Sequence, residues 1–141
     1  MVCLAASYLF FAPTPVVGEG GVIIIPALAE EGAGTGVGEQ RFLEKMRDAV
    51  DMPSLLSDLR RTGYPPGAQR AFVMAKVLEK NHVIIVGSRT PDVVREVKMI
   101  PAETMDEAFG MAVEKMGRND LDVLIVPHAL QTLPIVGGGE A

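Results

Sequence analysis

The stretch His82-Val-Ile-Ile-Val-Gly87 decides the fold of this chain. Its centre is a β-branched run without polar alternation, which is typical of a strand buried on both faces of a sheet. Val22–Ile25 and Leu121–Val126 are apolar runs of the same kind, and Lys98–Ile100 could add a short strand. Stretches with helical spacing of apolar residues lie between these runs. Strands separated by helices predict a three-layer α/β fold, Rossmann-like, with a mostly parallel sheet of about three to five strands flanked by helices.

The predicted helices carry end signals. Ser54 is a suitable N-cap for a helix that Gly63 ends, and Thr90 is a suitable N-cap for a helix with Pro91 at its first position. Thr104 opens a capping box, and Gly117 stops the helix that follows it. These signals delimit the helices that separate the strands.

Composition sets the class of protein. The chain has 141 residues, so we expect residues 1–141 to form one domain with a sizeable core and a frayed tail at 137–141. Hydrophobic residues make up 48% and aromatic residues 5%, so the core must be aliphatic. The net charge of -5 disfavours nucleic acid, whose binding needs a basic face. One cysteine and two histidines exclude an internal disulfide and a multi-histidine metal site within the chain, and they suit the cytoplasm.

The N-terminal segment, residues 1–15, is apolar and needs separate treatment. The first basic residue is Arg41, so the segment lacks the basic region of a signal peptide, and Pro13 and Pro15 interrupt it too early for a membrane-spanning helix. Leu4–Phe11 could be a helix or a strand. Because three of the seven aromatic residues lie there, we expect this segment to pack on the chain's own sheet or to form a homodimer.

A glycine-rich loop, Gly32-Ala-Gly-Thr-Gly-Val-Gly38, follows the first predicted strand. Its glycine spacing does not match the dinucleotide-binding fingerprint, and Glu30 and Glu31 place negative charge where a phosphate would lie. The loop is therefore interpreted as a flexible surface loop, with a Glu30 or Glu31 carboxylate facing a cleft as the alternative.

Four residues form the predicted ligand site. Gln69 and Arg70 open a helix, where they either bind an anion or form a solvated first turn. His128 follows the run Leu121–Val126, and it either donates to a ligand or ties the turn that follows. Ligands of parallel sheets bind outside the carboxyl ends of the strands, so we expect these residues to border one concavity with Glu31. His82 is interpreted as a strand-edge residue without a role.

The same segments, taken in order, resemble the C-terminal domain of the nickel-pincer lactate racemase family. The resemblance covers about Pro15 to Pro134, and it depends on the order and spacing of several strings, none of which is a catalytic signature. These strings are Pro15-Val-Val-Gly-Glu-Gly-Gly-Val-Ile-Ile-Ile25, the acidic, glycine-rich loop, Glu39-Gln-Arg-Phe42, Gly67-Ala-Gln-Arg-Ala71 leading into Met74-Ala-Lys-Val-Leu78, and Pro127-His-Ala-Leu-Gln-Thr-Leu-Pro134.

This resemblance implies a two-domain protein with its active site between the domains. In that family a nickel ion is held by a pincer cofactor, a modified pyridinium nucleotide attached to a lysine. Histidines of the N-terminal domain ligate nickel and move protons, while hydride leaves a 2-hydroxy acid carbon and returns to either face. None of those groups has a counterpart here. We therefore expect no catalytic residue, metal or cofactor in this chain, and the nickel-pincer nucleotide is implied for the two-domain protein alone.

One family feature is absent from the sequence. The family places a substrate-binding lysine shortly before the first strand of this domain, at about the position of Tyr8, and this chain has no lysine or arginine there. The first hypothesis is a cleft-forming racemase domain, inactive alone, whose partner is a missing N-terminal domain or a separate chain carrying it. The alternatives are a stand-alone interaction or regulatory module and a small-ligand binding domain.

Overall fold

The structure, a computed structural model that describes residues 2–132, is an α/β fold built on a three-stranded parallel sheet. The strands are β1 (Val22–Pro26), β2 (His82–Val86) and β3 (Ile100–Ala102), in the spatial order β1-β2-β3. Val22 pairs with His82 and Ile84 with Ile100. The predicted fold class, an α/β protein with a parallel sheet flanked by helices, is confirmed.

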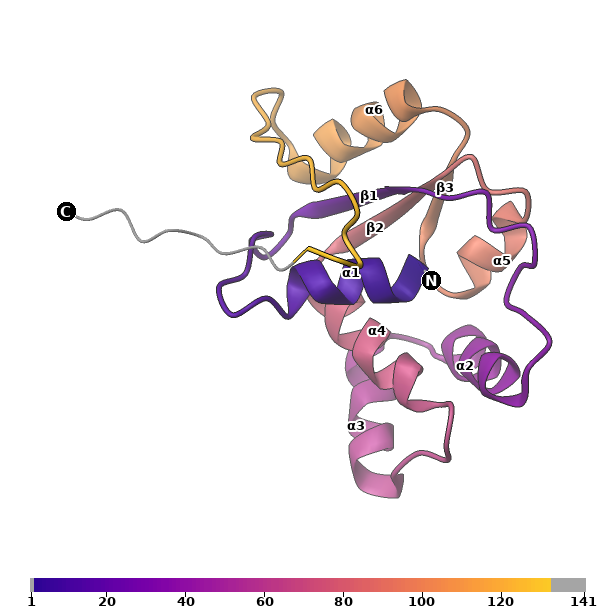
Figure 1. The fold of residues 1–141 in the computed structure, drawn as a ribbon. Coiled ribbons are helices and arrows are strands. Elements are labelled where there is room, and N and C mark those ends of the chain that lie inside the picture. The colour runs from indigo at the N-terminus through magenta and orange to yellow at the C-terminus, as the bar shows by residue number, and fades with distance from the viewer. Residues whose placement is uncertain (1, 133–141) are drawn as a thin grey trace.

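Helices cover both faces of this sheet (Figure 1). One face carries α1 (Val2–Phe10) and α4 (Gln69–Lys80), and α6 (Met105–Met116) lies against the opposite face. The remaining helices extend the α4 side: α2 (Val37–Asp48), α3 (Met52–Thr62) and α5 (Pro91–Glu96). The sheet is therefore the middle of three layers.

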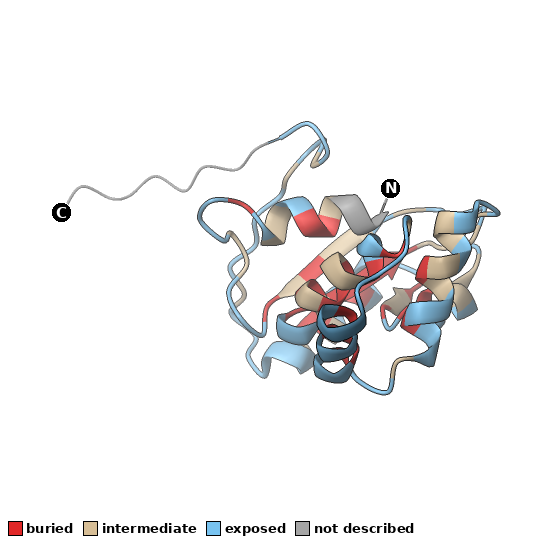
Figure 2. Ribbon diagram, turned by 90° about the horizontal axis from the view of Figure 1, so that it is seen from below, coloured by how far each residue is buried: buried red, intermediate tan, exposed pale blue. Residues whose placement is uncertain are grey.

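The side chains of β2 alternate between two cores. Val83 and Ile85 point into a large cluster that includes Met46, Leu56 and Met74 from the helices, all of them at most 1% exposed. Ile84 and Val86 point to the other face, where they meet Ala102 and the α6 residue Ala108. Burial of one such aliphatic side chain stabilises a fold by about 1.5–3 kcal/mol. The buried residues accordingly follow the central strand and the inner helix faces (Figure 2).

The ends of α3 and α6 follow local side-chain chemistry. Asp51 is the N-cap of α3, and its carboxylate accepts a 2.7 Å hydrogen bond from the Ser54 N–H, so the prediction that Ser54 is the cap was wrong. This bond also holds the pKa of Asp51 below its ordinary value. At the α6 start, the predicted Thr104 cap is confirmed, because its hydroxyl accepts from the Glu107 N–H; the Glu107 carboxylate accepts from the Glu103 N–H and not from Thr104, so the reciprocal bond of the predicted capping box is shifted by one residue.

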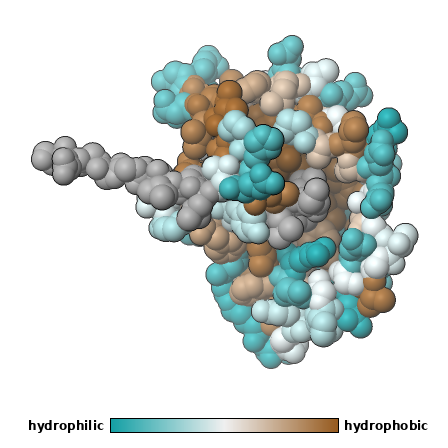
Figure 3. Space-filling view, viewed as in Figure 1, coloured by the Kyte–Doolittle hydropathy of each residue, from teal (hydrophilic) through white to brown (hydrophobic). Residues whose placement is uncertain are grey.

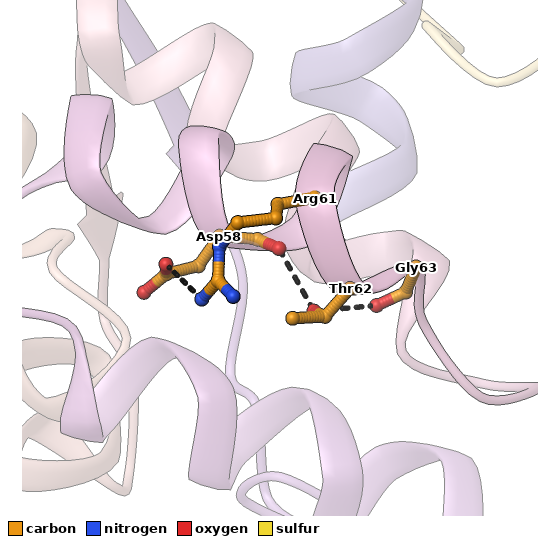
Figure 4. Close-up of polar contacts among 4 residues, drawn as sticks. All are labelled: Asp58, Arg61, Thr62 and Gly63. Carbon is orange, nitrogen blue, oxygen red and sulfur yellow. Dashed lines mark hydrogen bonds and ion pairs between the residues drawn. The ribbon is translucent and has the colours of Figure 1, made fainter.

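The last turn of α3 is closed by three polar contacts (Figure 4). Arg61 pairs with Asp58 at 3.1 Å, and the Thr62 hydroxyl donates to the Asp58 carbonyl at 2.8 Å and to the Gly63 carbonyl at 3.2 Å. Gly63 has φ +70°, and its N–H donates to the Leu59 carbonyl. The prediction that Gly63 ends this helix is confirmed.

The run Leu121–Val126, predicted as a buried strand, is not a strand in the described structure. Val123, Leu124 and Ile125 are 58%, 64% and 81% exposed. The backbone there is irregular, and none of its described groups joins the backbone ladder of β1, so the strand-forming sequence lacks a hydrogen-bonded partner. The third strand is instead β3, which begins at the end of the short run Lys98–Ile100.

The apolar N-terminal segment forms α1, which settles the choice between helix and strand. It contacts α4 and β1, and Ala6 is fully buried between them. Tyr8 and Phe11 are still 47% and 46% exposed, so the segment is only partly covered by its own domain. No helix among residues 2–132 is both long and apolar enough to span a bilayer. The predicted tail 137–141 lies outside the described residues.

Candidate functional site

The loop after β1 is fastened to the loop after β2 at the carboxyl edge of the sheet. The Arg89 N–H donates to the Leu28 carbonyl at 2.8 Å, and the Thr90 hydroxyl donates to the Ala29 carbonyl at 3.0 Å. The Arg89 guanidinium also pairs with Glu30 at 2.8 Å. Thr90 precedes α5 but makes no side-chain cap, which corrects the predicted capping role: its hydroxyl is used by a residue far away in sequence. The pairing of Arg89 was not predicted, because no local pattern links the two loops.

The glycine-rich loop turns sharply and closes on itself. Gly32 and Gly34 have φ of +58° and +85°, and the Gly34 N–H donates to the carbonyl of exposed Glu31. The Glu39 carboxylate then folds back over the start of α2, where it accepts from the Gly36 N–H at 2.9 Å. The Glu39 carboxylate therefore already occupies the start of α2, where a phosphate would otherwise bind. The geometry supports the interpretation that the loop is not a phosphate cradle.

Gln69 and Arg70 lie beside this loop, at the start of α4. The backbones of Gly38 and Gly67 approach so closely that a Cβ on Gly67 would overlap the Gly38 Cα. Arg41 strengthens this junction by donating to the Pro66 carbonyl at 2.8 Å. The Gln69 side chain accepts from the Gly67 N–H at 2.6 Å, so it fixes its own turn, while the exposed Arg70 forms none of the ion pairs found in the described chain.

His128 occupies a turn with φ +53°, a left-handed conformation that is uncommon for a residue other than glycine. Its carbonyl accepts from the Gln131 N–H at 2.7 Å and from the Thr132 hydroxyl at 3.2 Å, so its backbone ties the turn. No hydrogen bond or ion pair of the described residues joins it to the glycine-rich loop. The structure thus places Glu31 in the loop after β1, Gln69 and Arg70 at the start of α4, and His128 in a separate turn.

His82, at the start of the central strand, has a shifted titration. Partial burial lowers the pKa of its imidazole below the ordinary value, and the nearby Lys115 ammonium of α6 lowers it further. The imidazole is therefore neutral near pH 7.

Two concavities lie on the α1 side, and neither includes any of the four predicted site residues. A hollow of about 320 Å³ lies at the carboxyl end of α1. It is lined by Tyr8, Phe11, Ala12, Leu130, Gln131 and Thr132. Tyr8 lies near the position at which the family resemblance implies a substrate-binding lysine; the six lining residues carry hydroxyl and amide groups but no charge, and the Lys76 ammonium lies 5.7 Å from the ring centroid of Phe11. A second, apolar groove follows the outer edge of β1.

The residues of the described chain do not fit a resident metal. Within residues 2–132 there is no group of three or more His, Cys, Asp or Glu side chains arranged to hold a metal ion. The two histidines lie at the start of β2 and in the turn after residue 126. The nickel-pincer group implied by the resemblance therefore has no binding set here, and no reaction step is assigned to it in this chain.

Comparison with known proteins identifies the family. The family model described as the lactate racemase C-terminal domain matches residues 10–133, so the chain belongs to this family. Among solved structures, the fold matches the lactate racemase apoprotein from Thermoanaerobacterium thermosaccharolyticum, with a TM-score of 0.65 and 24% sequence identity over 81% of this chain. The match covers 26% of the racemase, so the chain corresponds to about a quarter of that protein. No curated protein matches the chain.

Proposed function

We propose that this chain serves as the C-terminal, cleft-forming domain of a 2-hydroxy acid racemase-like or epimerase-like protein that depends on a nickel-pincer cofactor. The observation that carries the proposal is the family match over residues 10–133. The chain supplies one wall of an interdomain cleft. A catalytic domain, on the same protein or on a separate chain, supplies the cofactor and the groups that move protons.

The described residues support a wall rather than a catalytic centre. They contain no group of three or more metal-binding side chains, and the six lining residues of the hollow beside Tyr8 are uncharged, with the Lys76 ammonium 5.7 Å from the ring centroid of Phe11. The half-exposed rings of Tyr8 and Phe11, together with Leu130 at 38% exposure, form an apolar rim that a second domain can cover. On this proposal we expect the isolated chain to be inactive.

The second candidate is a stand-alone interaction or regulatory module that kept the fold and lost the chemistry. The uncharged lining beside Tyr8 favours it, because this is the position where the family resemblance implies a lysine. The third candidate, a small-ligand binding domain, would use the predicted site of Glu31, Gln69, Arg70 and His128; within it, the Gln69 side chain already accepts a hydrogen bond from the Gly67 N–H.

A domain-exchange experiment separates these functions. Residues 10–132 replace the matching quarter of the Thermoanaerobacterium thermosaccharolyticum racemase, and the nickel-loaded chimera is tested by chiral chromatography on several 2-hydroxy acids. We expect racemisation of at least one substrate, and its loss when Leu56, 1% exposed in the core, is changed to Asp. A folded, nickel-loaded chimera without racemase activity would contradict the proposal and favour the interaction module.

A further inference from the structure

The outer edge of β1 borders an apolar groove of about 180 Å³. On one side lie the strand residues Val22–Pro26, and on the other lie Leu124 and Val126 from the segment that follows α6. Figure 1 shows this segment passing beside β1 on its way to α1, and Figure 3 shows apolar side chains gathered on the same face. A strand edge and an apolar segment are therefore already neighbours.

The backbone of β1 offers unpaired groups to this groove. The Ala27 N–H donates to the Val86 carbonyl and the Gly21 carbonyl accepts from the His82 N–H, so the odd-numbered residues of this stretch face β2. Alternate residues of a parallel strand bond toward opposite neighbours, and the N–H and C=O groups of Val22 and Ile24 therefore point to the outer edge. Pro26 is also even-numbered, so its backbone faces the outer edge of the sheet, where the missing N–H of a proline is tolerated.

The neighbouring segment has the composition of a buried strand. Val123-Leu-Ile-Val126 is an unbroken apolar run, yet its first three residues are more than half exposed. Both α1 and α6 contact β1 from opposite faces. A strand added beside β1 would thus be covered on both sides, the environment for which such a run is suited.

Chain topology also favours this position. The connections from β1 to β2 and from β2 to β3 run on the α4 side, whereas α6 lies on the opposite face. A connection from β3 through α6 to the outside of β1 crosses the sheet in the opposite direction and on the opposite face. These two reversals cancel, so the crossover is right-handed, as almost all such connections are. The path from β3 through α6 therefore leads to a parallel strand outside β1.

We propose that residues 121–126 dock in parallel on the free edge of β1 as a fourth strand, giving the order 121–126, β1, β2, β3. The strand order would then reverse direction between β1 and residues 121–126. In parallel sheets such a reversal creates a crevice outside the carboxyl ends of the two adjacent strands, here β1 and residues 121–126. The glycine-rich loop with Glu31 follows one of these strands, and the turn with His128 follows the other. Docking therefore brings the glycine-rich loop and the turn with His128 to the same end of the sheet, although no hydrogen bond or ion pair joins them in the described structure. This proposal does not depend on the proposed function of the domain.

Amide hydrogen exchange by NMR on the full 141-residue chain tests the proposal. We expect the amides of Val22 and Ile24, and alternate amides of residues 121–126, to exchange at least about tenfold more slowly than exposed loop amides. Nuclear Overhauser contacts should join the two segments in parallel register. Free exchange throughout residues 121–126, or protection that disappears on dilution as a dimer dissociates, would overturn docking within one chain.

Matched aspartate variants give an independent measurement. Leu124 is 64% exposed at the rim of the groove and Val50 is 93% exposed, so Leu124→Asp would lower Tm only slightly more than Val50→Asp if the segment stayed as described. Docking predicts that Leu124→Asp lowers Tm by several degrees and removes the exchange protection of Ile24, while Val50→Asp does neither. Melting temperatures within about a degree of each other, with unchanged exchange of the Ile24 amide, would contradict the proposal.

Discussion

Gly67→Ala tests the junction that sets Gln69 and Arg70 beside the glycine-rich loop. Gly67 has φ +92°, and an added Cβ would overlap the Gly38 backbone. A left-handed conformation costs a residue with a Cβ about 1–2 kcal/mol. Overlap with atoms that cannot rotate away adds about 1–3 kcal/mol. We therefore expect Gly67→Ala to lower the free energy of unfolding by about 2–5 kcal/mol.

The matched control for this variant is Gly117→Ala. Gly117 ends α6 with φ +66°, and an added Cβ there meets nothing within 4 Å. The control therefore carries the conformational cost alone, about 1–2 kcal/mol. Urea denaturation followed by circular dichroism measures both variants. If Gly67→Ala is no more destabilising than Gly117→Ala, the close approach of Gly67 to Gly38 is not made and the reasoning is refuted.

Three further predictions concern a helix cap, a titrating group and the α1 surface. Thr104→Ala should destabilise the chain by about 1 kcal/mol, because the Glu107 N–H loses its acceptor, and Thr104→Ser should restore most of the loss; equal urea midpoints for the two variants would contradict the cap. The lowered pKa of His82 means that the unfolded chain binds its proton more readily, so stability should fall as the pH drops from the ordinary histidine pKa of about 6.5 through the lowered folded value. His82→Asn should remove this part of the pH dependence, and an unchanged profile in urea titrations would refute it. A homodimer through α1 should weaken when exposed Tyr8 and Phe11 are both changed to Ser, as measured by light scattering over a range of concentrations; a wild-type chain that is monomeric throughout would exclude that dimer.

Features with local causes were predicted well from sequence. The Gly63 helix end and the Thr104 cap involve groups within four residues of one another, and the structure confirms both. The start of α3 was ambiguous because Asp51 and Ser54 are both good caps and lie three residues apart. The alternation of β2 between two cores follows directly from its uninterrupted apolar run.

Features set by contacts between distant residues could not be predicted. The Thr90 hydroxyl is used by Ala29, and Arg89 pairs with Glu30, because two loops meet in space. The apolar run at residues 121–126 has the composition of a strand, but a strand also requires a hydrogen-bonded neighbour, and composition does not specify one. None of Glu31, Gln69, Arg70 and His128 lines the hollow or the groove found on the α1 side, so the ligand site stays a prediction.

Nickel content and racemase activity of the isolated chain test the central claim most directly. The purified chain is incubated with nickel and freed of unbound metal. Elemental analysis then measures nickel per chain, and chiral chromatography measures interconversion of D- and L-lactate. The account predicts no retained nickel and no racemisation, because the described residues lack a metal-binding group and the chain acts as a cleft wall. Stoichiometric nickel or measurable racemisation by the chain alone would contradict it.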